Sequence, residues 1–281
     1  MAARFYDSRI CTLDNVRRQA ESGRSGGKAG LRFSVGIPHY NRGARIYRPL
    51  CNLLSHPAVA EVVIVDDGSS AAEYSALTAC VRGLDTSGRV KIHRREENRG
   101  ALLTKLECAE LSASEWMLIL DSDNTAFTHF LDALAGLEEP SPDTFYCAGW
   151  AFPYFPFHEF AGLKIGFSMA ADLTVSGALR RIYIINDGNY LVHRDSYVRS
   201  VRQMLPIASD VADVMVVNYH WLSQGRYLRV LPGTSYYHRV DASSFWCRTE
   251  EESRRRVAGI FSRFEAGSRW DEEFGCSLSH D

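Results

Sequence analysis

The feature that most constrains the fold is an alternation of short apolar runs with helical patterns between residues 31 and 125. The apolar runs are RFSVGIP (32–38), EVVIVDD (61–67), RVKIHRRE (89–96) and EWMLILD (115–121). Helical spacing of apolar residues is found at 47–54, 74–81 and 100–113. Strands that alternate with helices form parallel sheets with right-handed crossovers. The sequence therefore predicts an α/β fold with a Rossmann-like, mostly parallel central sheet flanked by helices.

The pattern after residue 125 is less regular. Strand–turn–strand patterns are found at 144–152 and 183–198, and a helical pattern at 209–225. Residues 226–240 fit either a further strand pair or a strand followed by a loop. We expect three parts: an N-terminal helix and flexible glycine-rich linker (1–30), a single domain (31–245), and a C-terminal helical segment (246–281).

Composition narrows the range of partners and compartments. The net charge is −2, which gives no bulk attraction for nucleic acid. The seven cysteines are scattered without a CxxC pair, so neither a disulfide framework nor a zinc site is expected. No signal peptide and no run of about 18 apolar residues is visible. These features predict a cytoplasmic protein, one that could still be membrane-associated by docking on a lipid surface.

Polar residues follow three of the predicted strands. The ends read PHYNR, DDGSS and DSDN. Ligands of parallel α/β sheets bind beyond the carboxyl ends of the strands. The sequence therefore predicts a binding site at one edge of the sheet.

The carboxylates of Asp121 and Asp123 are the strongest candidates for metal binding. Residues two apart on a strand point the same way, so both side chains face one cation if the strand continues to its tip. Oxygen ligands of this kind suit Mg²⁺ or Mn²⁺. The alternative is that Asp123 or Asn124 caps a following helix.

The other two strand ends offer groups for a nucleotide. Asp66 or Asp67 could accept a hydrogen bond from a nucleobase or a ribose hydroxyl, although one of them could instead cap the next helix. The ring face of Tyr40 could stack on a base, and the amide of Asn41 could hydrogen-bond to it. The alternative is that Asn41 is present because the backbone turns there. No GxGxxG fingerprint or P-loop is present.

The segments FSVGIPHYNR, EVVIVDDGSS and ENRGALLTKLECAELSASEWMLILDSDN, taken in this order and spacing, resemble the family 2 glycosyltransferases with the GT-A fold. The resemblance covers 31–125 well and continues more loosely to about residue 244. It implies a nucleotide-sugar-binding half (31–125) and a smaller mixed acceptor half (126–245). It also implies metal-dependent transfer of a sugar from a nucleotide-sugar donor, with a UDP-sugar favoured, to a hydroxyl acceptor with inversion.

The resemblance also assigns roles to individual residues. Asp123 is the expected direct ligand of Mn²⁺ or Mg²⁺, assisted by Asp121 and His238, and Arg239 is a further phosphate candidate. Lys105 replaces an arginine that is common in the family. The expected donor-binding residues are Pro38, Tyr40, Asn41, Asp66, Asp67, Asn98, Gly100, Lys105, Asp121 and Ser122.

The acceptor half must supply a base. The resemblance favours Asp213, with Asp210 as the second choice, although Ala212 stands where the family has a glutamate and either aspartate could merely favour a helix N-terminus. Asp187, Gly188 and Asn189 are the expected contacts to sugar or acceptor, although Asp-Gly is also a turn signal. The acceptor would be a saccharide, a lipid-linked group or another hydroxyl compound.

Two other readings of the sequence remain open. A nucleotidyltransferase also builds an α/β sheet with a metal-binding aspartate. A non-catalytic nucleotide-sugar-binding module would share the fold but have no turnover. The aromatic run 150–160 fits a sugar-stacking platform, a lipid-facing lip or ordinary core packing.

Overall fold

The structure is a computed structural model that describes residues 30–175, 183–205, 212–240 and 250–267. The expected N-terminal helix and linker, and the candidate base Asp210, lie outside the described residues. No helix in the described ranges combines the length and apolar character needed to cross a membrane.

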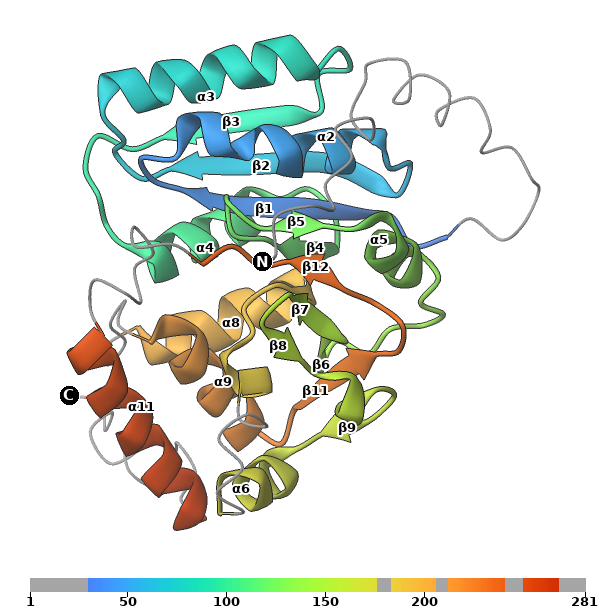
Figure 1. Ribbon diagram of the computed structural model, residues 1–281, viewed down its shortest axis with the longest axis vertical. Helices are drawn as coiled ribbons and strands as arrows, with labels where there is room; N and C mark the ends of the chain where they lie inside the picture. Colours follow the sequence, from blue (N-terminus) through green and yellow to red (C-terminus); the bar gives the residue numbers. More distant parts are fainter. Residues whose placement is uncertain (1–29, 176–182, 206–211, 241–249, 268–281) are drawn as a thin grey trace, which may run out of the picture.

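A large mixed sheet forms the centre of the molecule (Figure 1). Its strand order is β3-β2-β1-β4-β10-β6-β11-β9. The pairs among β1 to β4 are parallel, and β10 pairs antiparallel with both β4 and β6. The bounds are β1 (Phe33–His39), β2 (Val59–Asp66), β3 (Val90–Arg94), β4 (Trp116–Ile119), β6 (Thr144–Ala148), β9 (Lys164–Ile165), β10 (Tyr190–His193) and β11 (Tyr227–Leu231).

A small second sheet lies beside the central one, in the order β5-β12-β7-β8. Its strands are β5 (Thr125–Ala126), β7 (Trp150–Phe152), β8 (Phe155–Pro156) and β12 (Tyr236–Tyr237). The α/β fold with a mostly parallel central sheet and a smaller mixed part is therefore confirmed.

Helices cover the sheet and connect its strands (Figure 1). Helix α4 packs against β1, β2 and α8, while α11 packs against α6 and α9. The helices are η1 (Gly43–Ile46), α2 (Tyr47–Ser55), α3 (Ala71–Leu84), α4 (Ala101–Leu111), α5 (Thr128–Ala135), η2 (His158–Phe160), α6 (Phe167–Val175), η3 (Tyr183–Asn186), α8 (Arg194–Met204), α9 (Asp213–Ser223) and α11 (Glu250–Glu265).

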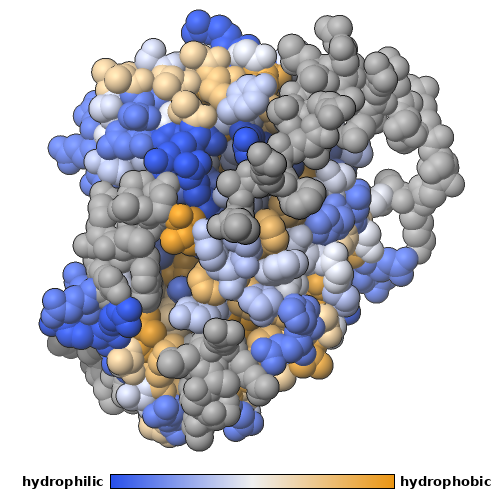
Figure 2. Space-filling view, viewed as in Figure 1, coloured by the Kyte–Doolittle hydropathy of each residue, from blue (hydrophilic) through white to orange (hydrophobic). Residues whose placement is uncertain are grey.

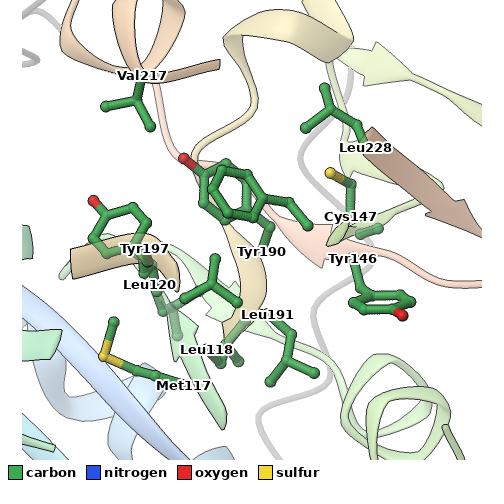
Figure 3. Close-up of a cluster of buried hydrophobic side chains, with 14 of the residues drawn as sticks. Met117, Leu118, Leu120, Tyr146, Cys147, Tyr190, Leu191, Tyr197, Val217 and Leu228 are labelled. Atoms are coloured by element: carbon green, nitrogen blue, oxygen red, sulfur yellow. The ribbon is translucent and has the colours of Figure 1, made fainter. Parts of the chain in front are cut away.

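The core continues across the junction of the two halves at β4 and β10. All four residues of β4 are buried, and Leu118 pairs with Leu191 across the antiparallel junction (Figure 3). Phe145 of β6 stacks on Trp221 of α9 with ring centroids 3.9 Å apart. This packing fixes α9, and with it Asp213, against the end of the parallel sheet.

Two segments differ from the sequence-based expectation. Strand β1 ends at His39, one residue beyond the apolar run 32–38, because β4 pairs with β1 only as far as Gly36, so the N–H that Pro38 lacks is not needed there. Residues 183–198 are not strand–turn–strand: they form η3, the short strand β10 and the start of α8, whose N-cap is the side chain of His193.

We expect Leu118→Ala to lower the free energy of unfolding by about 3 kcal/mol, because it removes apolar atoms from a fully buried site at the junction of the two halves. The matched control is Leu163→Ala, at a side chain that is 42% exposed, where a change within about 0.5 kcal/mol is expected. Urea unfolding followed by circular dichroism measures both values. Equal effects of the two substitutions would contradict the described packing.

Candidate active site

The first two strands end in a buried pair, His39 and Asp66. The Nδ1 atom of His39 lies 2.8 Å from Oδ1 of Asp66, and both side chains are inaccessible to solvent. Burial alone would raise the pKa of Asp66, but hydrogen bonds with His39 and Ser69 outweigh it and lower the pKa. Asp66 therefore faces the protein interior and ties β1 to β2 at the edge of the site.

Asp67 organises the turn that precedes α4. Its carboxylate accepts hydrogen bonds from Nη1 of Arg95 and the backbone N–H groups of Arg99 and Gly100, each at 2.9 Å. Gly68 permits this arrangement, since its φ is +73° and a Cβ there would lie 2.7 Å from the carbonyl carbon of Glu97. Asp67 thus lies at the predicted edge and is held by internal donors.

The remaining residues expected near a nucleobase also lie at this edge. Tyr40 is 37% exposed, Pro38 is half-buried and Asn98 is exposed. Asn41 has φ +50°, and its Oδ1 accepts from the backbone N–H of Ser70, the N-cap of α3. The positive φ of Asn41 agrees with the interpretation of this residue as part of a turn. The ring of Tyr40 is accessible to solvent.

Asp121 and Asp123 lie in a turn rather than at the end of a continuous strand. Strand β4 ends at Ile119, and the backbone N–H of Asn124 donates to the carbonyl of Asp121 at 3.0 Å. The expectation that strand geometry continues through the two aspartates was wrong. The turn, rather than the strand, determines where the carboxylates of Asp121 and Asp123 lie relative to each other. Neither Asp123 nor Asn124 caps a helix, since the N-cap of α5 is Phe127.

Cationic side chains face both aspartates. Arg42 forms an ion pair with Asp123, whose side chain is 11% exposed. The Nζ atom of Lys105 lies 3.8 Å from Oδ1 of Asp121, whose side chain is 34% exposed. These contacts provide the positive charge that two neighbouring carboxylates require.

Lys105 also joins the two halves of the site. Its Nζ donates to Oδ2 of Asp213 at 2.8 Å, across 108 positions of sequence. Burial alone would lower the pKa of Lys105, but Asp213 and Asp121 outweigh it and raise the pKa well above its ordinary value. A charged ammonium therefore lies between the aspartate at the end of β4 and the aspartate that begins α9.

A hydrogen-bond network extends from Asp121 toward the second sheet. Asn189 accepts from the backbone N–H of Asp121 at 3.0 Å, and its Nδ2 lies 3.2 Å from the hydroxyl of Tyr236. Tyr236 in turn donates to Oδ1 of Asp187 at 3.0 Å. Burial raises the pKa of Asp187 to about 7. The segment expected to contact sugar is thus connected to the expected metal-binding turn.

Gly188 has a packing role in this structure. A Cβ at this position would lie 2.7 Å from Cγ2 of Val214, the second residue of α9. The absent side chain lets the first turn of α9, with Asp213, approach β10.

The residues predicted to hold a metal come together only in part. His238 is half-buried, and burial lowers its pKa while the charge of Asp121 acts in the opposite direction. Carboxylates such as those of Asp121 and Asp123 are the oxygen ligands that Mn²⁺ and Mg²⁺ favour. Within the described ranges, however, no three acidic, histidine or cysteine side chains are arranged to hold an ion, and Asp123 is paired with Arg42.

Sequence reasoning missed several members of the site. Arg42, Arg95 and Tyr236 were inside quoted segments but had no assigned role, because their partners are far away in the sequence. The buried His39 was also missed, although an alternating strand pattern that ends in His beside an Asp-rich strand end could have indicated it.

The family model "Glycosyl transferase family 2" matches residues 34–172. The "Uncharacterized glycosyltransferase MG060 homolog" of Mycoplasma pneumoniae is 30% identical over 112 residues, which are 39% of this chain and 37% of that protein. The "Succinoglycan biosynthesis protein ExoU" of Rhizobium meliloti is 34% identical over 87 residues, 31% of this chain and 25% of that protein. The matched stretches thus span well under half of these relatives.

Solved structures share the fold. S. aureus TarS is 20% identical with a TM-score of 0.56, and the match covers 89% of this chain and 76% of that chain. The mannosyltransferase PcManGT from Pyrobaculum calidifontis, in complex with GDP-Man and Mn²⁺, is 17% identical with a TM-score of 0.59, covering 88% and 69%. The fold is therefore the GT-A fold. The chain belongs to glycosyltransferase family 2.

We expect Lys105→Met to lower the free energy of unfolding by about 2 to 3 kcal/mol, because it leaves two carboxylates without their shared cation. Adding Asp213→Asn should restore part of this loss. The control is Arg202→Met at the exposed pair with Glu110, where the loss should be below about 1 kcal/mol. Denaturant titration of the single and double variants tests this, and purely additive losses would contradict a direct Lys105–Asp213 pair.

Asp187 should make stability depend on pH. Its pKa in the folded protein, about 7, is above the ordinary value of 3.8, so folding favours its protonated form. The associated stabilisation is complete below about pH 4 and is lost as the pH rises through 7, a change of roughly 4 kcal/mol. We expect Asp187→Asn to flatten this part of the pH–stability curve.

The matched control is Asp195→Asn, whose side chain is 56% exposed and pairs with Arg194. This variant should keep the wild-type decrease in stability between pH 4 and pH 8. Chemical unfolding at several pH values measures all three proteins. A wild-type curve that rises over this range, with no effect of Asp187→Asn, would show that Asp187 is ionised in the folded state.

Proposed function

We propose that this protein transfers a sugar from a nucleotide-sugar donor, most simply a UDP-sugar, to a hydroxyl acceptor. The supporting observation is the convergence of Asp121, Lys105 and Asp213 at the carboxyl edge of the parallel strands, in a chain of glycosyltransferase family 2. S. aureus TarS has been solved with UDP and with UDP-GlcNAc, and PcManGT with GDP-Man, so this fold accommodates such donors.

The nucleotide would lie along the edge formed by β1, β2 and the turn before α4. Tyr40 offers its exposed ring to the base, beside Pro38 and Asn98. Asp66 and Asp67 support this edge from inside, and the backbone near Gly100 starts α4, whose N-terminus favours negative charge. In this proposal the two aspartates position the donor site, and Ser122, which is buried, shapes the turn below it.

Asp121, Asp123 and His238 are the groups that would hold a divalent cation, Mn²⁺ or Mg²⁺. Such an ion neutralises the charge that develops on the departing diphosphate. For Asp123 to take part, it must exchange its partner Arg42, whose guanidinium would then be placed to pair with a phosphate. Arg239, which is exposed one residue after His238, is a second candidate for phosphate contact.

Asp213 is the proposed base. It takes the proton of the acceptor hydroxyl while that oxygen forms a bond to the anomeric carbon, and the bond from this carbon to the diphosphate breaks with its electron pair leaving on the phosphate oxygen. A single displacement of this kind inverts the configuration. Lys105 holds the Asp213 carboxylate at 2.8 Å and so fixes its position before substrates bind.

Asp213→Asn should abolish turnover while leaving donor affinity within about twofold, because the base acts only on the acceptor proton. Asp123→Asn should instead weaken donor binding in the presence of Mn²⁺. The control is Asp195→Asn, whose side chain is 56% exposed and pairs with Arg194. Release of nucleoside diphosphate from UDP-glucose, UDP-GlcNAc and GDP-mannose, measured with and without Mn²⁺, tests the proposal.

Other outcomes select the alternatives. A wild-type protein that binds a donor but never releases nucleoside diphosphate, even by slow hydrolysis, would be a binding module. An Asp213→Asn variant with normal turnover would rule out Asp213 as the base.

A further inference from the structure

The hairpin formed by β7 and β8 is an uncharged aromatic segment at the edge of the second sheet (Figure 1). No aspartate, glutamate, lysine or arginine occurs from residue 144 to residue 157. Trp150 is 38% exposed, and Tyr154, in the turn of the hairpin, is 53% exposed. Pro153 and Pro156 are exposed as well. Large aromatic side chains gathered at a surface without charges commonly mark a contact with a partner.

Aromatic rings lie on both faces of this hairpin. Trp150 and Phe152 are two residues apart in β7 and share one face, with ring centroids 4.9 Å apart. Phe155 of β8 pairs with Ala151, the residue between them, and so belongs to the opposite face. There Tyr183, which is 40% exposed, has its ring centroid 4.7 Å from that of Phe155. The rings therefore surround the hairpin instead of forming one flat platform.

Backbone donors in the turn of the hairpin are used internally or are absent. The N–H of Tyr154 donates to the carbonyl of Ala151 at 3.0 Å. Pro153 and Pro156 have no N–H group. A segment that enters a lipid bilayer must satisfy its backbone groups internally, because hydrocarbon offers no hydrogen-bond partners. The turn of this hairpin meets that requirement.

The start of the hairpin and the start of β9 contact neighbouring residues of β11. A Cβ on Gly149, which precedes β7, would lie 3.0 Å from the carbonyl oxygen of Leu231. The N–H of Gly162, two residues before β9, donates to the carbonyl of Val230 at 2.9 Å. Strand β9 therefore begins close to the base of the hairpin.

Two exposed cations lie in this neighbouring segment. Lys164 of β9 and Arg229 of β11 are partners in the antiparallel ladder, so their side chains share a face of the sheet. Neither is paired with a carboxylate within the described ranges. Leu163, beside Lys164, is 42% exposed. Exposed cations next to exposed apolar side chains complement the anionic headgroups of a lipid surface.

Saccharides and lipids both fit exposed aromatic rings, and the observations favour lipid. A sugar ring stacks on one face of a platform, whereas this hairpin carries rings on both faces and in its turn. Trp and Tyr are the residues enriched at membrane–water interfaces. In Figure 2, hydrophobic surface lies in small areas between hydrophilic ones, which suits a shallow contact and not a deeply embedded face.

We propose that the β7–β8 hairpin docks this protein on the surface of a phospholipid bilayer that carries anionic headgroups. The exposed aromatic rings enter the headgroup region, and Lys164 and Arg229 lie against lipid phosphates. The hairpin adjoins the proposed reaction site, since the ring centroid of Phe155 lies 5.6 Å from that of His238. Docking therefore brings the acceptor half next to the membrane. Binding to lipid requires no donor, so this inference is independent of the proposed transfer.

Co-sedimentation of the full chain with vesicles tests the proposal. The vesicles are phosphatidylcholine alone, or phosphatidylcholine mixed with phosphatidylglycerol, each at low and at high salt. The hairpin variant is Tyr154→Asp, and the cation variant is Lys164→Glu. The matched controls are Tyr47→Asp, at a tyrosine of α2 that is 45% exposed, and Arg202→Glu, at a cation whose side chain is 62% exposed.

The wild type should bind the mixed vesicles, and added salt should weaken this binding because it screens the attraction of the cations. Tyr154→Asp and Lys164→Glu should each weaken binding roughly tenfold, whereas each control should change it less than about twofold. Lipids brominated near the headgroup should quench the tryptophan fluorescence of the wild type and quench that of Trp150→Phe much less. This quenching keeps the test valid if Tyr154→Asp fails to fold.

Three results would overturn the docking. One is a wild type that sediments with neither kind of vesicle. Another is wild-type binding by Tyr154→Asp together with unchanged quenching in Trp150→Phe, which would leave only electrostatic adsorption. The third is a change in the fluorescence of Trp150 on adding maltohexaose without any binding to vesicles, which would assign the hairpin to a saccharide.

Discussion

The contact on which the site depends is the buried ammonium of Lys105 between Asp213 and Asp121. It brings an aspartate from the acceptor half to an aspartate at the end of β4, at 2.8 Å and 3.8 Å from one nitrogen. Without a cation there, two carboxylates in a partly buried setting would repel each other. A lysine rather than an arginine makes this a point-charge contact without the geometry of a guanidinium fork.

A second set of hydrogen bonds also holds Asp121 in place. Asn189 bonds to Asp121, and Tyr236 connects Asn189 with Asp187. Asp121 follows β4, Asp187 and Asn189 precede β10, and Tyr236 lies in β12, so the network joins segments next to both sheets. The position of the proposed metal-binding turn is therefore set by the packing of the small sheet against the large one, and a sugar bound near Asp187 would act on the same network.

The sequence allowed the strands to be placed more accurately than the side chains. The apolar runs located β1, β2 and β4 within a few residues, because burial on both faces requires continuous apolar sequence. The same reasoning assigned Asp66 and Asp67 to an edge but not to their partners, His39 and Arg95. It also missed that Asp121 and Asp123 lie in a turn, since a strand of four residues cannot be distinguished from one of seven by composition.

The sequence by itself determined the fold class, the family resemblance and the edge of the sheet at which the polar residues gather, because these follow from the local alternation of apolar and polar residues. Only the tertiary structure decided which charges meet. Arg42 pairs with Asp123, and Lys105 with Asp213, across 81 and 108 positions of the chain respectively. Contacts between residues so far apart depend on how the two halves pack at β4 and β10, and no local pattern encodes that packing.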